Sequence, residues 1–81
     1  MYKTKYIVFK RNCLEWAVIF PACWDHNSTA AQLLIEDVVV SAGFVTTDAD
    51  GKLCAVGESV TLGVKSRRTD TALIREQLTS W

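Results

Sequence analysis

The fold is decided first by residues 2–21, which read YKTKYIVFKRNCLEWAVIFP. Residues 2–10 are rich in β-branched and aromatic types, and residues 14–20 alternate between two faces, which is typical of strands. A short polar break around Asn12 separates the two runs, and asparagine suits a turn with positive φ. This pattern predicts a β-hairpin that ends at Pro21, because proline cannot donate to a sheet ladder.

A helix is expected after the hairpin, running to about Asp37, where β-branched residues take over. Three residues of types that cap helix N-termini precede good helix formers, namely Asp25, Asn27 and Ser28. The buried stripe of this helix is predicted to contain Ala30, Leu33 and Leu34.

The later strands are expected at residues 38–47, 53–56 and 59–64. Asp48–Lys52 is the strongest turn signal, because Asp-Gly tolerates the positive φ of a tight hairpin. Gly43 predicts a bulge, a bend or a bulky neighbour pressing on the backbone. A final helix is predicted from Thr71 to about Leu78, capped by Thr69 or Asp70.

The element order is therefore β-β-α-β-β-(β)-α, with no repeat, low-complexity tract or linker. Strand-forming residues outnumber helix-forming ones. We predict one α+β domain over residues 1–81, with a single antiparallel sheet of four to five strands and two helices on one face.

Composition narrows the classes of function. The 81 residues carry nine basic and nine acidic groups, and this zero net charge argues against a general nucleic-acid coat protein. It also favours self-association, so a homodimer is expected. The apolar run at residues 6–9 is too short for a signal-peptide core or a membrane span. We therefore expect a cytoplasmic protein without membrane contact.

The chain offers little for catalysis or metal binding. Its three cysteines are widely spaced and its single histidine is His26, so four zinc ligands would be hard to assemble. Residues 23–26 read Cys-Trp-Asp-His, but adjacency in sequence does not place a base against a thiol. His26 is predicted to be a surface or cap residue. The Asp48–Gly51 stretch lacks the distal acidic ligand of a calcium loop. We predict no catalytic residue, no cofactor and no metal.

Two groups of residues are candidates for partner binding. Lys65-Ser66-Arg67-Arg68 precedes the last helix, where Lys65, Arg67 and Arg68 could converge on a phosphate or on a partner's carboxylates. A solvated loop is the more common state of such a charge run. Trp24, with His26 beside it, would be a natural interface anchor if exposed, because aromatic residues dominate interface hot spots.

Three pieces of the chain resemble small proteins encoded by bacteriophages and prophages, most of which have no assigned role. The pieces are VIFP (18–21) running into WDH (24–26), AGF (42–44), and GESVTLGVKSR (57–67) followed by Asp70 and Leu73-Ile74. The resemblance covers about two-thirds of the chain, and the last piece is the most specific. The resemblance implies a phage accessory protein that interferes with a host system, in a bacterial cytoplasm, and it carries over no catalytic residue.

Two hypotheses of function follow. The first is a non-enzymatic phage-type accessory protein that binds a host or phage protein and modulates or inhibits it, counter-defence being one such role. The alternative is a module that binds nucleic acid or nucleotide phosphate through Lys65–Arg68, aided by four basic residues near the N-terminus, Lys3, Lys5, Lys10 and Arg11.

Overall fold

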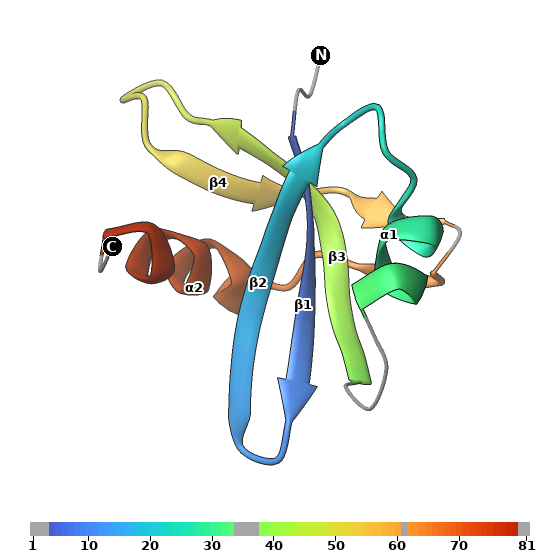
Figure 1. Cartoon of the computed structure of the whole chain (residues 1–81). Coiled ribbons are helices and arrows are strands. Elements are labelled where there is room, and N and C mark those ends of the chain that lie inside the picture. The colour runs from blue at the N-terminus through green and yellow to red at the C-terminus, as the bar shows by residue number, and fades with distance from the viewer. Residues whose placement is uncertain (1–3, 34–37, 61, 80–81) are drawn as a thin grey trace.

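The computed structural model describes residues 4–33, 38–60 and 62–79 (Figure 1). In chain order its elements are β1 (Thr4–Arg11), β2 (Leu14–Pro21), α1 (His26–Leu33), β3 (Val38–Thr47), β4 (Leu53–Val56), β5 (Glu58–Ser59), β6 (Val64–Lys65) and α2 (Arg68–Thr79). The first four strands form an antiparallel sheet in the order β2-β1-β3-β4, and β5 and β6 form a separate two-stranded ribbon. The predicted α+β class is confirmed.

The N-terminal hairpin forms as the sequence predicts. Arg11 pairs with Leu14 across the turn, and Asn12 adopts the positive φ of 57° that the turn requires. β1 lies inside the sheet, between β2 and β3. The lysines of β1, Lys5 and Lys10, therefore do not lie at a sheet edge.

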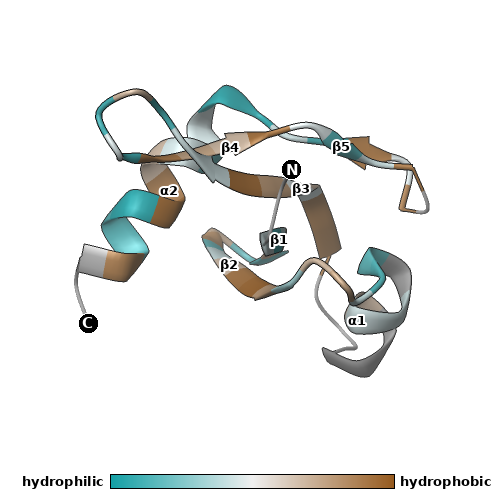
Figure 2. Ribbon diagram, turned by 90° about the horizontal axis from the view of Figure 1, so that it is seen from above, coloured by the Kyte–Doolittle hydropathy of each residue, from teal (hydrophilic) through white to brown (hydrophobic). Residues whose placement is uncertain are grey.

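The two helices pack against opposite faces of the sheet, which corrects the prediction that both lie on one face (Figure 2). Tyr6 packs in one cluster with Ile74 of α2, and Ile7 belongs to a second cluster that contacts Ala30 of α1. Consecutive strand residues point to opposite faces. The unbroken apolar run at residues 6–9 is buried on both faces, so each face needs its own cover.

Gly43 sits where a neighbouring chain leaves no room for a side chain. A Cβ at this position would overlap the carbonyl oxygen of Val56 and lie 3.3 Å from the Tyr6 ring. The β-bulge is elsewhere, at the register shift between Val8 and Phe9 opposite β3. Of the three predictions for Gly43, the bulky neighbour is therefore correct.

The β3–β4 connection is the predicted tight hairpin. The Asp48 N–H donates to the Lys52 carbonyl at 2.8 Å, and Gly51 has φ 79°. The Asp48 carboxylate accepts the backbone N–H groups of Asp50 and Lys52. These bonds, led by the one from Lys52, lower the pKa of Asp48.

The predicted strand over residues 59–64 is wrong, because the chain turns back within it. Gly63 has φ 70°, and its N–H donates to the Ser59 carbonyl at 2.9 Å, which closes the β5–β6 ribbon. Val60 is 84% exposed, whereas Leu62 and Val64 pack against the sheet face that α1 also covers. The alternating apolar residues Val60, Leu62 and Val64 therefore do not form one face of a strand.

α1 begins after a predicted aspartate cap, whereas α2 begins earlier than predicted. Asp25 precedes α1 and accepts the Ser28 N–H at 3.0 Å, which confirms it among the three candidate caps. α2 begins at Arg68 instead of Thr71, so the predicted caps Thr69 and Asp70 both lie within its first turn, and the prediction of a cap at either position is wrong. The predicted α1 positions Leu34 and Asp37 lie outside the described residues, as does the side chain of Leu33.

α2 forms hydrogen bonds to both edge strands of the sheet. Near its start, the Thr71 hydroxyl accepts the backbone N–H of Ala55 in β4 at 2.9 Å, and Arg75 donates to a carbonyl of the same strand at 2.6 Å. Near its end, the Gln77 amide bonds the backbone of Ala17 in β2. The sheet curls around one helix, which lies beside both edges (Figure 2).

Candidate functional site: an aromatic corner and an apolar strand edge

Trp24 projects from the corner where β2 turns into α1. Its backbone N–H donates to the Pro21 carbonyl at 3.0 Å, and Lys5 Nζ donates to the Trp24 carbonyl at 2.7 Å. The indole is 53% exposed and stacks on Phe20, with ring centroids 6.4 Å apart. The corner therefore presents an aromatic side chain that is exposed but supported from below.

His26 lies beneath this corner and is 4% exposed, so the prediction of a surface or cap residue is wrong. The rings of Phe20 and Phe44 contact the imidazole edge to face at 5.5 and 5.6 Å. Its Nε2 lies 2.8 Å from the carbonyl oxygen of Gly43, which accepts the ring N–H. These partners come from β2 and β3, and a local sequence pattern cannot reveal them.

Burial lowers the pKa of His26, because it disfavours the charged form of the imidazole. The hydrogen bond to Gly43 acts in the opposite direction. Cys23 is exposed, so the thiol and the buried imidazole occupy different environments. The arrangement fits a core histidine that supports Trp24 through Phe20.

The basic residues at 65–68 differ in their surroundings. Lys65 is exposed in β6, where it pairs with Glu58 of β5 in the strand register. Arg67 is committed to two carboxylates, those of Glu15 and Asp70. Arg68 is exposed as the first residue of α2. Of the three cations, Arg67 is thus paired within the molecule, whereas Lys65 and Arg68 are exposed.

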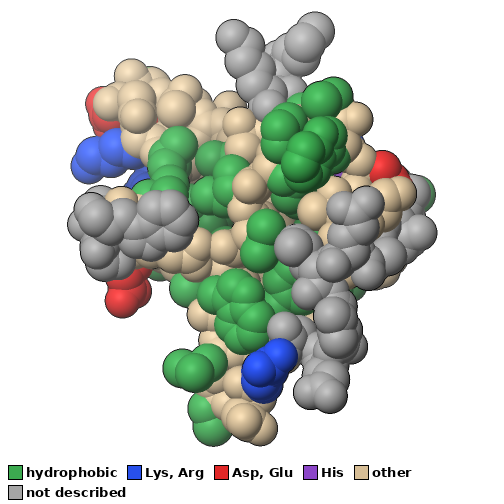
Figure 3. Space-filling model, in the orientation of Figure 1, with side chains coloured by type: hydrophobic (Ala, Val, Ile, Leu, Met, Phe, Trp, Pro, Cys, Tyr) green, Lys and Arg blue, Asp and Glu red, His purple; other side chains and the backbone are tan. Residues whose placement is uncertain are grey.

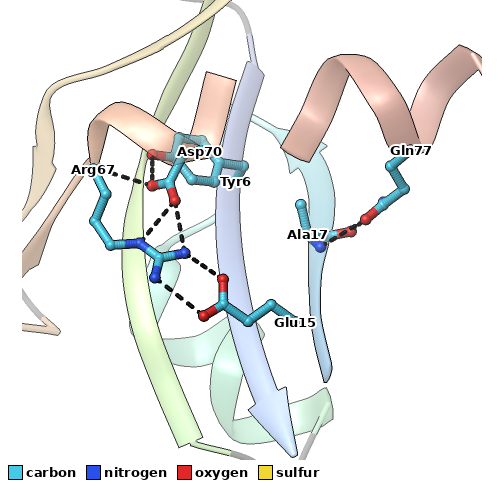
Figure 4. Close-up of polar contacts among 6 residues, drawn as sticks. All are labelled: Tyr6, Glu15, Ala17, Arg67, Asp70 and Gln77. Atoms are coloured by element: carbon cyan, nitrogen blue, oxygen red, sulfur yellow. Dashed lines mark hydrogen bonds and ion pairs between the residues drawn. The ribbon is translucent and has the colours of Figure 1, made fainter. Parts of the chain in front are cut away.

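The Arg67 contacts belong to a polar network that ties α2 to the hairpin (Figure 4). Asp70 is fully buried and accepts three kinds of donor: the Tyr6 hydroxyl at 2.6 Å, the Arg67 backbone N–H at 2.9 Å and its guanidinium at 2.9 Å. The same guanidinium reaches Glu15 of β2 at 2.8 Å. The network orders Arg67 instead of offering it to a ligand.

The network also sets the protonation of its members. Burial, followed by the hydrogen bond to Asp70, raises the pKa of Tyr6 far above its ordinary value. The hydrogen bond from Arg67 lowers the pKa of Glu15, and that bond raises the pKa of Arg67 in turn. Tyr6 is therefore a neutral donor and the two carboxyl groups face a permanent cation.

An apolar hollow of about 660 Å³ lies between β2 and the end of α2. Its lining has no charged side chain and consists of Trp16, Ala17, Val18, Ile19, Gln77 and Leu78. Leu14 on the same strand is 73% exposed. Hydrophobic side chains follow the line of β2 over this side of the molecule (Figure 3).

Sequence reasoning missed the residues that shape this edge. The sequence pattern places Gln77 within the last helix and predicts no further role for it, yet its amide forms hydrogen bonds with the backbone of Ala17. Asp70 was expected as a cap, and its link to Tyr6, 64 positions away, was not foreseen. A signal for Asp70 existed, because a carboxylate in the first helical turn directly after a basic run has cations within reach.

Comparison with protein-family models, with curated proteins and with solved structures finds no match for this chain. Within the described residues, no group of three or more potential metal ligands comes together. The described part of the chain also has no helix long and apolar enough to cross a membrane.

Proposed function

We propose that this protein is a non-enzymatic binding module that docks on another protein through the β2 surface, meaning Leu14, Trp16, Val18, Ile19 and Trp24. The observation that carries the proposal is Trp24, which is 53% exposed while stacked on Phe20 and fixed by the turn at Pro21. An exposed aromatic side chain that is already ordered loses little conformational entropy on binding.

The apolar residues along β2 extend this anchor into a surface. Interfaces characteristically place aromatic anchors at the centre of a patch and depend on the neighbouring contacts to exclude water. Exposed apolar patches on small proteins also tend to mark interaction sites. The hollow beside β2 supplies such a patch within reach of the same strand.

The resemblance to phage and prophage proteins supplies the biological setting of the proposal. The partner is then a host or phage protein in the bacterial cytoplasm, and docking modulates or inhibits it, for example as counter-defence. Small size supports this role, because an 81-residue domain can cover a partner's site without a catalytic apparatus of its own. No cofactor or metal enters the proposed role.

The alternative, a nucleic-acid or phosphate binder, has less support. It requires Lys65, Arg67 and Arg68 to act together, and Arg67 already pairs with two carboxylates within the molecule. A phosphate would have to compete with those partners. Homodimerisation stays a prediction, although α2 occupies backbone groups on both sheet edges.

Site-specific photo-crosslinking tests the proposed function. A benzoylphenylalanine replaces Trp24 in one sample and Val60, which is 84% exposed on the β5–β6 ribbon, in the control. In bacterial lysate, position 24 should crosslink to one protein that position 60 does not capture. In addition, Trp24→Ala should reduce co-purification of that protein at least tenfold, and Val60→Ala should not. Equal behaviour of the two positions would show that the β2 surface is not the docking site.

A further inference from the structure

The outer edge of β2 already holds a side chain that imitates an added strand. Gln77 Oε1 accepts the Ala17 N–H at 2.8 Å, and Gln77 Nε2 donates to the Ala17 carbonyl at 2.6 Å (Figure 4). One amide thus makes both bonds that a neighbouring antiparallel strand would make at this residue. This edge is therefore geometrically able to receive a peptide group.

The backbone groups of β2 alternate in direction from one residue to the next, and this alternation exposes the N–H and carbonyl of Ile19. Ala17 directs its N–H and carbonyl away from β1, and residues two apart in a strand direct theirs the same way. Ile19, which pairs with Tyr6 in the same ladder, therefore also directs its N–H and carbonyl outward. Among residues 4–33, 38–60 and 62–79, no side chain bonds these groups as Gln77 bonds Ala17.

The opposite edge of the sheet is more fully occupied. Its strand β4 directs Leu53 and Ala55 outward, and α2 bonds both of them, through Arg75 and Thr71. β2 receives a single residue from α2, at Ala17. The half of β2 that leads to Pro21 is thus the place where a further strand has backbone to pair with.

We propose that the partner inserts an extended, apolar segment along the outer edge of β2, pairing its backbone with Ile19 and placing side chains in the adjoining hollow. This inference rests on the proposed function and names the docking mode. The hollow has no charged lining residue, and its volume of about 660 Å³ lies within the usual range of ligand pockets. Strand addition of this kind takes affinity from the main chain and selectivity from alternate side chains.

Pro21 and Gln77 limit the length over which the partner's segment can pair with β2. Pro21 has no N–H and its carbonyl already accepts the Trp24 N–H, so pairing stops there. Gln77 stops it at the other end, since its amide occupies Ala17. Removal of the Gln77 amide frees one more residue for pairing, so Gln77 acts as a competitor of the incoming strand.

The probe is a displayed library of random 12-residue peptides, selected on the folded chain. The best peptide is then synthesised, and its Kd is measured for the wild type and for three variants, Ile19→Pro, Ile19→Ala and Gln77→Ala. Ile19→Pro removes the outward N–H without removing a bond to β1, and Ile19→Ala is its matched control because both truncate the side chain. Circular dichroism and urea unfolding establish that each variant folds.

Four results are expected. The selected peptides alternate apolar and polar residues, Ile19→Pro binds at least tenfold more weakly than Ile19→Ala, and Gln77→Ala binds more tightly than the wild type. Hydrogen exchange of the Ile19 amide slows when the peptide is bound. Failure to select any peptide, or equal binding by the proline and alanine variants, overturns strand addition.

The outcomes also separate this inference from the proposed function. Ile19→Pro and Ile19→Ala could bind the peptide with the same Kd while Trp24→Ala still fails to co-purify the crosslinked protein. Docking would then occur through side chains, and only the strand-addition mode would be wrong. If light scattering shows a dimer that Ile19→Pro alone dissolves, the edge is occupied by a second copy of this chain, and the proposed occupant is wrong.

Discussion

Asp70 holds together three parts of the molecule through one carboxylate. It bonds Tyr6 in β1 and Arg67 at the start of α2, and Arg67 in turn reaches Glu15 in β2. Because Asp70 is fully buried, its charge is not screened by water and depends on these donors. This residue determines where α2 begins and how it sits on the sheet.

Asp70→Asn is expected to destabilise the fold by about 3 kcal/mol, because removing one partner of a buried charge network leaves the other partner uncompensated. Urea unfolding followed by tryptophan fluorescence measures the change. Glu15→Gln is the matched control, since it removes a charge from the exposed end of the same network. Its effect should be much smaller. Equal losses in the two variants would contradict the central role of Asp70.

His26 makes stability depend on pH in a window where no other side chain of ordinary pKa titrates. Its pKa is lowered from 6.5, mainly by burial, with Lys5 lowering it further and both Gly43 and Asp25 raising it. The unfolded chain therefore binds more protons than the folded chain below about pH 6.5. The stabilising contribution is complete above this value and is lost as pH falls toward the folded pKa.

The expected outcome is a free energy of unfolding that decreases from pH 7 to pH 5. His26→Gln, which cannot titrate, should be less stable at pH 7 but should show a flatter profile in this window. Urea titrations at half-unit intervals of pH measure both curves. As the chain has a single histidine, a slope that persists in the variant would assign it to another group.

At the scale of elements, α2 forms hydrogen bonds with the backbone of both edge strands of the sheet. An edge strand exposes unpaired backbone groups that invite association, and natural proteins cover such edges. Here one helix reaches both edges, bonding two residues of β4 through Thr71 and Arg75 but only Ala17 of β2 through Gln77. Ile74 lies between these flanks and is buried against Tyr6 and Val8.

Thr71→Val keeps the shape of the side chain but removes the hydroxyl that accepts the Ala55 N–H. We expect a loss of about 1–2 kcal/mol, because a partly buried donor is left unsatisfied. Thr69→Val makes the same change at an exposed position two residues earlier in the same helix. Hydrogen exchange should show faster exchange of the Ala55 amide in the first variant alone. Unchanged protection of that amide would refute the edge-capping role.

At the scale of the whole molecule, charge is balanced and locally paired. Lys65 lies across from Glu58, and Asp48 of the β3–β4 hairpin lies 3.6 Å from Arg75 of α2. Residues 1–11 carry four of the nine basic groups and no acidic group, and residues 25–50 carry five of the nine acidic groups and no Lys or Arg. Among the described residues, folding places opposite charges near one another at these two positions, and surface pairs of this kind contribute little to stability.

We therefore expect no binding of a fluorescein-labelled 20-nucleotide single strand at micromolar protein and 0.15 M salt. Binding of nucleic acid by neutral surfaces without a basic stripe is weak. Fluorescence anisotropy across a salt series measures it. Binding that weakens steeply with salt and disappears in Lys65→Ala/Arg68→Ala would restore the nucleic-acid hypothesis.

What the sequence determines by itself is local. The hairpin around Asn12, the Asp48–Lys52 turn and the cap at Asp25 follow from residues that are neighbours in the chain. Local chemistry governs these features, since a positive φ or a free helical N–H is satisfied within a few residues. The α+β class follows from the same patterns, because apolar periodicity survives tertiary packing.

Tertiary structure alone decides how these elements meet. It buries His26 under Trp24, pairs Arg67 with Glu15 and Asp70, and places the Gln77 amide on the edge of β2. Each of these facts depends on contacts between segments far apart in the sequence, where side chains compete for buried partners that no local pattern specifies. The proposed site is of this kind: its anchor can be read from the sequence, but its supporting residues and its open strand edge exist only in the folded chain.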